Sequence, residues 1–88
     1  MKDTVLAQTA RTPQQLGAAI KRARRAAGLS QSALAEKVGI WQETISKIEG
    51  GQTNARVDTL CDILAALDLE IAIRPRSKGS PEDIAEAF

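Results

Sequence analysis

The apolar residues between positions 13 and 68 recur at the three- and four-residue steps of amphipathic helices. Glycines and polar residues interrupt the repeat and divide it into four stretches. The pattern predicts four helices: one over about 13–27, one from the Ser30 cap to Gly39, one from the residues after Ile40 to Gly50, and one from Val57 to near Asp68.

Short-range capping signals mark the ends of the first two helices. Thr12 is placed to cap the first helix, Pro13 suits its first position, and Gln15 completes a capping box. Gly28 supplies the left-handed residue that ends this helix, and Ser30 can cap the next one. The sequence therefore predicts a helical core with tight connections.

The hydrophobic period changes after position 68. Residues 69–74 alternate large apolar with polar or small side chains, which predicts one strand with Leu69, Ile71 and Ile73 on one face. Pro75 cannot donate to a ladder and limits the strand. A lone strand leaves a row of unpaired backbone groups, and the chain offers no second strand, so this one needs an outside partner.

These boundaries divide the chain into four segments. We expect an N-terminal arm over 1–11, a helical domain over 12–68, a strand segment over 69–76 and a flexible tail over 77–88. Within the tail, residues 77–80 are typical of a linker, and 81–87 predict a weak helical turn before Phe88.

Composition narrows the chemistry that the chain can carry. Its 88 residues are the size of one domain and include a single cysteine, Cys61, and no histidine. An internal disulfide, a Cys/His metal cluster and a His-based catalytic dyad are therefore excluded, and we expect no metal or cofactor. No apolar run approaches 18 residues, so we expect a soluble protein without a membrane partner, which its free thiol would place in the cytoplasm.

The net charge of +1 conceals a polarised distribution. Residues 12–56 carry seven basic and three acidic side chains, a net +4, whereas residues 57–88 carry three basic and seven acidic ones, a net −4. The total says nothing about partners, but the distribution along the chain does.

The second and third helices, joined by a tight glycine-containing turn, form a helix-turn-helix candidate. Residues 28–40 have the sequence GLSQSALAEKVGI, and residues 44–51 have TISKIEGG. With both turns, the small Ala35, the Ile45 and Ile48 pair and Glu49 in register, residues 13–69 resemble the lambda-repressor-like helix-turn-helix family. The flanking patterns Thr-Pro-x-x-Leu and Gly-Ile-x-Gln-x-Thr-Ile-Ser make the chain similar to the HipB-type antitoxins of HipBA toxin–antitoxin modules.

The resemblance implies an all-α, lambda-repressor-like bundle of four to five helices with one C-terminal strand. Two subunits would pair their strands through Leu69, Ile71 and Ile73 and form a homodimer. That dimer would repress transcription at a palindromic double-stranded DNA operator and would also neutralise a HipA-type kinase toxin. A terminal aromatic residue, here Phe88, would dock on the toxin.

The resemblance also places the third helix in the major groove, where its first residues face base edges. Gln42 matches the family's main base-reading position, and its amide can pair with adenine N6 and N7. Glu43 can accept from cytosine N4, while Ser46 and Lys47 can reach bases or phosphates; an ordinary solvated face is the alternative for this surface. Trp41 stands where the family often has a capping Ser, Thr or Lys, so the cap is expected to be weak and the ring either contacts DNA or packs at the turn.

Phosphate contacts are expected from Gln31 at the start of the second helix, from Lys47 and from Arg56, because helix N-termini and basic groups attract anions. By resemblance, Arg24 pairs with Glu49 and also helps to hold a phosphate. Physically, Glu49 at a helix C-terminus opposes the helix dipole and needs a nearby cation. Solvation is the alternative for the other basic residues of the first helix, which are Lys21, Arg22 and Arg25.

Two other classes of function stay open. A stand-alone regulator without a toxin partner would share this fold, and its tail would be merely a disordered end. An enzyme is poorly supported, because the sequence contains no nucleophile–base pair, phosphate-cradling loop or carboxylate pair at catalytic spacing.

Overall fold

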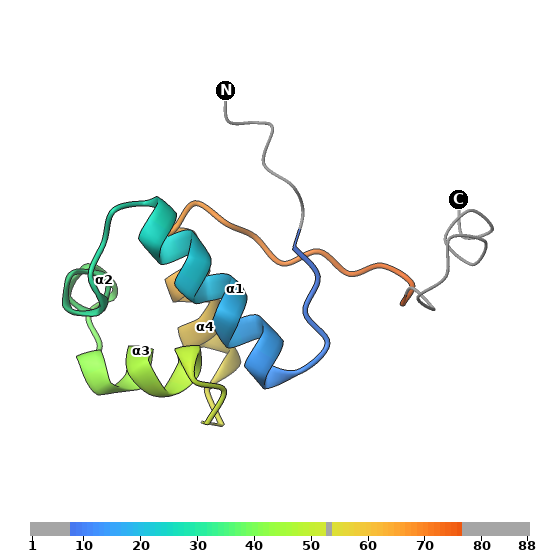
Figure 1. Ribbon diagram of the computed structural model, residues 1–88, viewed down its shortest axis with the longest axis horizontal. Coiled ribbons are helices and arrows are strands. Elements are labelled where there is room, and N and C mark those ends of the chain that lie inside the picture. Colours follow the sequence, from blue (N-terminus) through green and yellow to red (C-terminus); the bar gives the residue numbers. More distant parts are fainter. Residues whose placement is uncertain (1–7, 53, 77–88) are drawn as a thin grey trace.

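The computed structural model describes residues 8–52 and 54–76, and this part of the chain contains four helices (Figure 1). They are α1 (Pro13–Ala26), α2 (Gln31–Val38), α3 (Gln42–Glu49) and α4 (Val57–Ala66). All four predicted helices are present, and the all-α, lambda-repressor-like arrangement is confirmed. Helix α3 packs against both α1 and α2, and α4 packs against α2.

Each helix contributes one fully buried branched side chain to the centre of the core. These side chains are Ile20, Leu34, Ile45 and Ile63, each less than 2% exposed. Burial of one such side chain contributes about 1.5–3 kcal/mol, and all four are aliphatic. Smaller contributions come from the residues packed around them, which include Ala35, Ile48, Leu64 and Leu67.

Helices α1 and α3 cross at Gly17, which is buried. A Cβ atom at this position would clash with the carbonyl oxygen of Ile48 and would lie 2.7 Å from the carbonyl oxygen of Glu49. The absence of a side chain therefore allows the backbone of α1 to approach the last turn of α3.

The predicted caps are present, with one change of detail. Thr12 Oγ1 accepts from the backbone N–H of Gln15 at 3.0 Å, and Ser30 Oγ accepts from that of Ala33 at 3.0 Å. The side chain of Gln15 reaches one residue further back than in a capping box, because its Oε1 accepts from the backbone N–H of Arg11. Gly28 has the expected positive φ, 75°.

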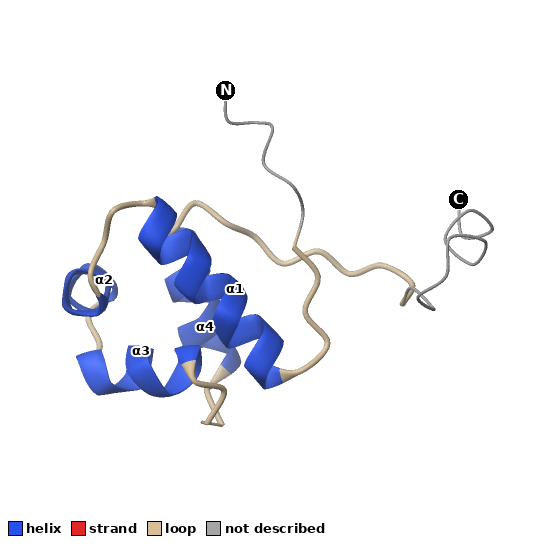
Figure 2. Cartoon of the chain, in the orientation of Figure 1, coloured by secondary structure: helices blue, strands red, loops and turns tan. Residues whose placement is uncertain are grey.

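The segment 69–76 is neither helix nor strand in the described chain (Figure 2). A strand needs a neighbour to complete its backbone ladder, and the described residues of this single chain supply none. Ile71 and Ile73 are 57% and 96% exposed, and Leu69 is 38% exposed. The strand thus stays a prediction that depends on a second subunit.

The described part of the N-terminal arm lies against α1 and the segment 69–76. The guanidinium of Arg22 donates to Gln8 Oε1 at 3.0 Å, and Nη2 of Arg74 donates to Thr9 Oγ1 at 2.6 Å. The predicted helical turn over 81–87 and the residue Phe88 lie outside the described residues.

Candidate nucleic-acid interface

Helices α2 and α3 form a helix-turn-helix unit with a closely held turn. Gly39 takes a left-handed conformation with φ 87°, and the backbone N–H groups of Gly39 and Ile40 both donate to the carbonyl of Ala35, at 2.8 and 3.0 Å. The turn therefore fixes the direction in which α3 leaves α2.

Helix α3 has one buried face and one exposed face. Ile45, Ile48 and Glu49 are buried, whereas the side chains predicted to contact DNA all lie on the exposed face: Gln42, Glu43, Ser46 and Lys47. The structure therefore brings the four predicted contact residues of α3 onto one surface.

Trp41 precedes this surface as the N-cap residue of α3 and is 79% exposed. Its side chain makes no capping hydrogen bond, as its type predicts. The exposed ring does not pack into the turn, so the structure leaves its apolar surface beside the start of α3.

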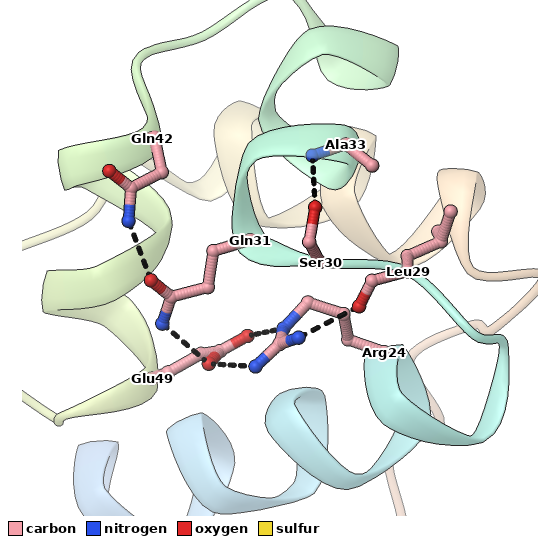
Figure 3. Close-up of polar contacts among 7 residues, drawn as sticks. All are labelled: Arg24, Leu29, Ser30, Gln31, Ala33, Gln42 and Glu49. Carbon is pink, nitrogen blue, oxygen red and sulfur yellow. Dashed lines mark hydrogen bonds and ion pairs between the residues drawn. The ribbon is translucent and has the colours of Figure 1, made fainter.

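A buried ion pair lies beneath the helix-turn-helix unit, as expected for Arg24 and Glu49 (Figure 3). Arg24 Nε donates to Glu49 Oε2 at 2.6 Å and Nη2 donates to Oε1 at 3.0 Å, while Nη1 donates to the carbonyl of Leu29 at 2.8 Å. The pair joins the end of α1 to the end of α3 and to the connection before α2. With only 8% of its side chain exposed, Arg24 presents little surface to a phosphate.

Both groups of the pair are held in their charged forms. Burial by itself would raise the pKa of Glu49, but hydrogen bonds from Arg24 and Gln31 outweigh it and lower that pKa below its ordinary value. The hydrogen bond to Glu49 raises the pKa of Arg24. The carboxylate therefore remains an acceptor for the groups around it at neutral pH.

The side chain of Gln31 extends this network to the exposed face of α3. Its Nε2 donates to Glu49 Oε1 at 3.1 Å, and its Oε1 accepts from Nε2 of Gln42 at 2.6 Å (Figure 3). Gln31 is the first residue of α2 and Gln42 the first of α3, so the turn brings the two helix starts together. The sequence pattern, which indicates a separate role for each glutamine, does not predict this bond.

The hydrogen bond to Gln31 uses only part of the hydrogen-bonding capacity of the Gln42 amide. One N–H of the amide donates to Gln31. The amide keeps a second N–H and a carbonyl oxygen, which are the donor and the acceptor that the N7 and N6 positions of adenine require.

The basic side chains around this face differ in their surroundings. Lys47 is exposed on α3, while the exposed Arg56 is paired with Asp58, its Nε donating to Oδ1 at 3.0 Å. The basic run of α1 does not form one patch, since Arg24 is buried and its neighbours are exposed: Lys21, Arg22 and Arg25.

The described part of the chain contains no cluster of three or more His, Cys, Asp or Glu residues placed to hold a metal ion. None of the four helices has the length and hydropathy needed to cross a membrane.

Comparisons with known proteins agree with this geometry. Residues 20–73 match the helix-turn-helix family HTH_3. The antitoxin HipB of Escherichia coli strain K12 is 39% identical over 71 residues, which are 81% of this chain and 81% of HipB.

Solved structures give the same relationship. A HipB–O4 20mer complex superposes with a TM-score of 0.71 at 38% identity, covering 78% of this chain and 97% of that one. A HipA–HipB–O2–O3 complex matches with the same values. SinR in complex with DNA, a master regulator for biofilm formation, has a TM-score of 0.58 at 39% identity over 62% of this chain and 89% of its own. The chain therefore belongs to the helix-turn-helix family, as a HipB-type antitoxin rather than an enzyme.

Proposed function

We propose that the protein is a dimeric repressor that binds a palindromic DNA operator through α3 and also neutralises a HipA-type kinase toxin. The observation that carries the proposal is the placement of Gln42, which Gln31 holds at the exposed start of α3. In this fold the start of the third helix enters the major groove, and a restrained amide loses less freedom when it pairs with a base.

The surroundings of Gln42 support the same mode of binding. Glu43, Ser46 and Lys47 line the exposed face of α3 and would contact further base edges or phosphates. Trp41 would place its ring against a base methyl group or the sugar backbone, and Gln31 and Arg56 would face phosphates at the two sides of the groove. HipB and SinR, which share this fold, have both been solved with DNA.

The dimer would form through the segment 69–76. Leu69, Ile71 and Ile73 are exposed in the single chain, and two such segments side by side would bury these side chains and pair their backbones. A two-fold dimer matches a palindromic site, because each subunit meets one half-site.

The proposed toxin contact is supported by the likeness to HipB. HipB is solved together with HipA, and the match covers 97% of that HipB chain. We propose a HipA-type kinase as the partner and Phe88, which lies outside the described residues, as one contact.

Two experiments test the proposal. In the first, duplexes that the protein retains from a random pool are sequenced; an enriched palindrome with an adenine in each half-site is expected, and retention without any shared sequence would contradict base reading. In the second, the protein is co-expressed with the product of the neighbouring gene. Co-purification supports the toxin partner, whereas separate elution favours a stand-alone regulator.

A further inference from the structure

Arg56 and Asp58 form a two-bonded pair at the start of α4, and the proposed DNA contact does not account for the carboxylate. Arg56 Nε donates to Asp58 Oδ1 at 3.0 Å, and Nη2 donates to Oδ2 at 3.1 Å. The side chains are 79% and 66% exposed, and such pairs contribute little to folding stability. The pair therefore contributes little to the fold.

The location of the pair connects it to the proposed interface. The loop that ends at Arg56 begins at the last turn of α3, where the backbone N–H of Gln52 donates to the carbonyl of Lys47 at 2.9 Å. In Figure 1 this loop continues directly from the C-terminal end of α3. When α3 occupies a major groove, a basic side chain beyond its end faces the phosphates that border the groove.

Asp58 is held by donors of the kind that bind phosphate oxygens. Besides the arginine, its Oδ1 accepts from the backbone N–H of Thr59 at 2.8 Å, in the first turn of α4. Guanidinium groups and the unpaired amides of a helix start are the donors that bind phosphates. The hydrogen bond from Arg56 also lowers the pKa of Asp58, so the carboxylate is ionised at neutral pH.

We propose that Asp58 is an internal competitor for the phosphate that Arg56 binds, and that it weakens sequence-independent DNA binding. This inference rests on the proposed DNA-binding function. A phosphate that approaches Arg56 must displace the carboxylate, which then remains close enough to repel it. Operator binding loses the same free energy but keeps its base contacts, so the ratio of the two affinities is unchanged while the absolute affinity for random DNA falls.

The test measures affinity for a labelled random-sequence 30-base-pair duplex by fluorescence anisotropy over a series of salt concentrations. Asp58→Asn should tighten binding at least threefold and steepen the salt dependence by about one unit, since Arg56 is then available to a phosphate. Asp62→Asn removes the same charge from an exposed position on the same helix and should have a smaller effect. With Arg56→Ala already present, Asp58→Asn should gain no more than Asp62→Asn.

The outcomes separate the inference from the function on which it rests. Equal effects of Asp58→Asn and Asp62→Asn, or weaker binding by Asp58→Asn, would overturn the competitor role while the wild-type protein still binds the duplex. A wild-type protein that fails to bind any duplex at low salt would contradict DNA binding itself. Asp58→Ser keeps a side-chain oxygen without the charge and should reproduce the Asp58→Asn result, with the helix content of both variants checked by circular dichroism.

Discussion

At the scale of single residues, Gln31 connects the buried ion pair to the exposed face of α3. It lies between the buried carboxylate of Glu49 and the exposed amide of Gln42, with hydrogen bonds of 3.1 and 2.6 Å. Because Arg24 also holds Glu49, the exposed amide of Gln42 is connected to a fixed charge pair by two side-chain hydrogen bonds. The orientation of Gln42 therefore depends on residues that do not touch the exposed face.

Replacement of Gln31 tests this dependence. Gln31→Ala should weaken binding to the selected palindromic duplex by about 1 kcal/mol, roughly fivefold, because Gln42 loses one hydrogen bond that orients it. Ser32→Ala, at an exposed position in the same turn of α2, should leave affinity unchanged. Anisotropy titrations on the selected and random duplexes separate this orienting role from the proposed phosphate contact: a larger loss on the palindrome is expected, whereas equal losses on both would show that Gln31 acts through a phosphate alone.

The ion pair predicts a pH dependence of stability. Glu49 has a pKa lowered from its ordinary value of 4.5, so its contribution is fully present above about pH 4.5 and is lost as the pH falls through the lower, folded-state value. Glu49→Gln leaves Arg24 buried without its counter-ion and should cost about 3 kcal/mol at pH 7.

Urea unfolding of both proteins between pH 3 and 7 checks this prediction. The difference in free energy of unfolding between wild type and Glu49→Gln should shrink as the pH falls below 4.5, since the unfolded wild-type carboxylate is protonated first and the folded one only at its lowered pKa. A difference that stays constant over this range would mean that the charge of Glu49 does not stabilise the fold.

At the scale of elements, the helix ends were predictable because their signals are local. Thr12 and Ser30 act on amides three residues away, and Gly28 and Gly39 adopt the left-handed conformation for which their type is suited. The close crossing of α1 and α3 at Gly17 was not predictable, because it depends on two segments about thirty residues apart. The same applies to the bond between Gln31 and Gln42, since no periodicity encodes which exposed side chains meet across a turn.

The crossing predicts an unusual response to a helix-favouring substitution. Gly17→Ala should destabilise the protein by about 1–3 kcal/mol, although alanine is the better helix former, because the added methyl group meets backbone carbonyls of α3. Gly50→Ala is the control, since its Cβ would have no neighbour closer than 3.4 Å. Thermal unfolding followed by circular dichroism compares them; equal melting temperatures would show that the helices can move apart at no cost.

At the scale of the whole molecule, one apolar segment of the described chain is left without a packing partner. The helical core is closed, but Ile71 and Ile73 remain exposed beyond it. The alternation of residues 69–74 indicated which side chains need a partner, whereas the partner itself is outside the chain and could not be predicted from the pattern alone. The pairing of Arg56 with Asp58 was not predicted for another reason. A basic side chain beside a DNA-binding helix is expected to face a phosphate, and the sequence does not show that a carboxylate two residues away takes that place.

The alternation makes a prediction about assembly. Ile71→Asp should raise the dimer dissociation constant by about a hundredfold, because each subunit would place a charge where about 1.5–3 kcal/mol of apolar burial is expected. Ala72→Asp introduces the same charge on the opposite face and should have little effect. Sedimentation equilibrium measures both; a dimer that is equally sensitive to the two changes would exclude a strand-like contact.

Recognition of DNA sequence by α3 through Gln42 is tested by the specificity of Gln42→Ala. Affinities of wild type and variant are measured on the selected palindromic duplex and on random duplex at the same salt concentration. A loss of about 1–3 kcal/mol per half-site is expected on the palindrome and almost none on random DNA. Equal losses on the two duplexes, or no loss on either, would contradict base reading by Gln42.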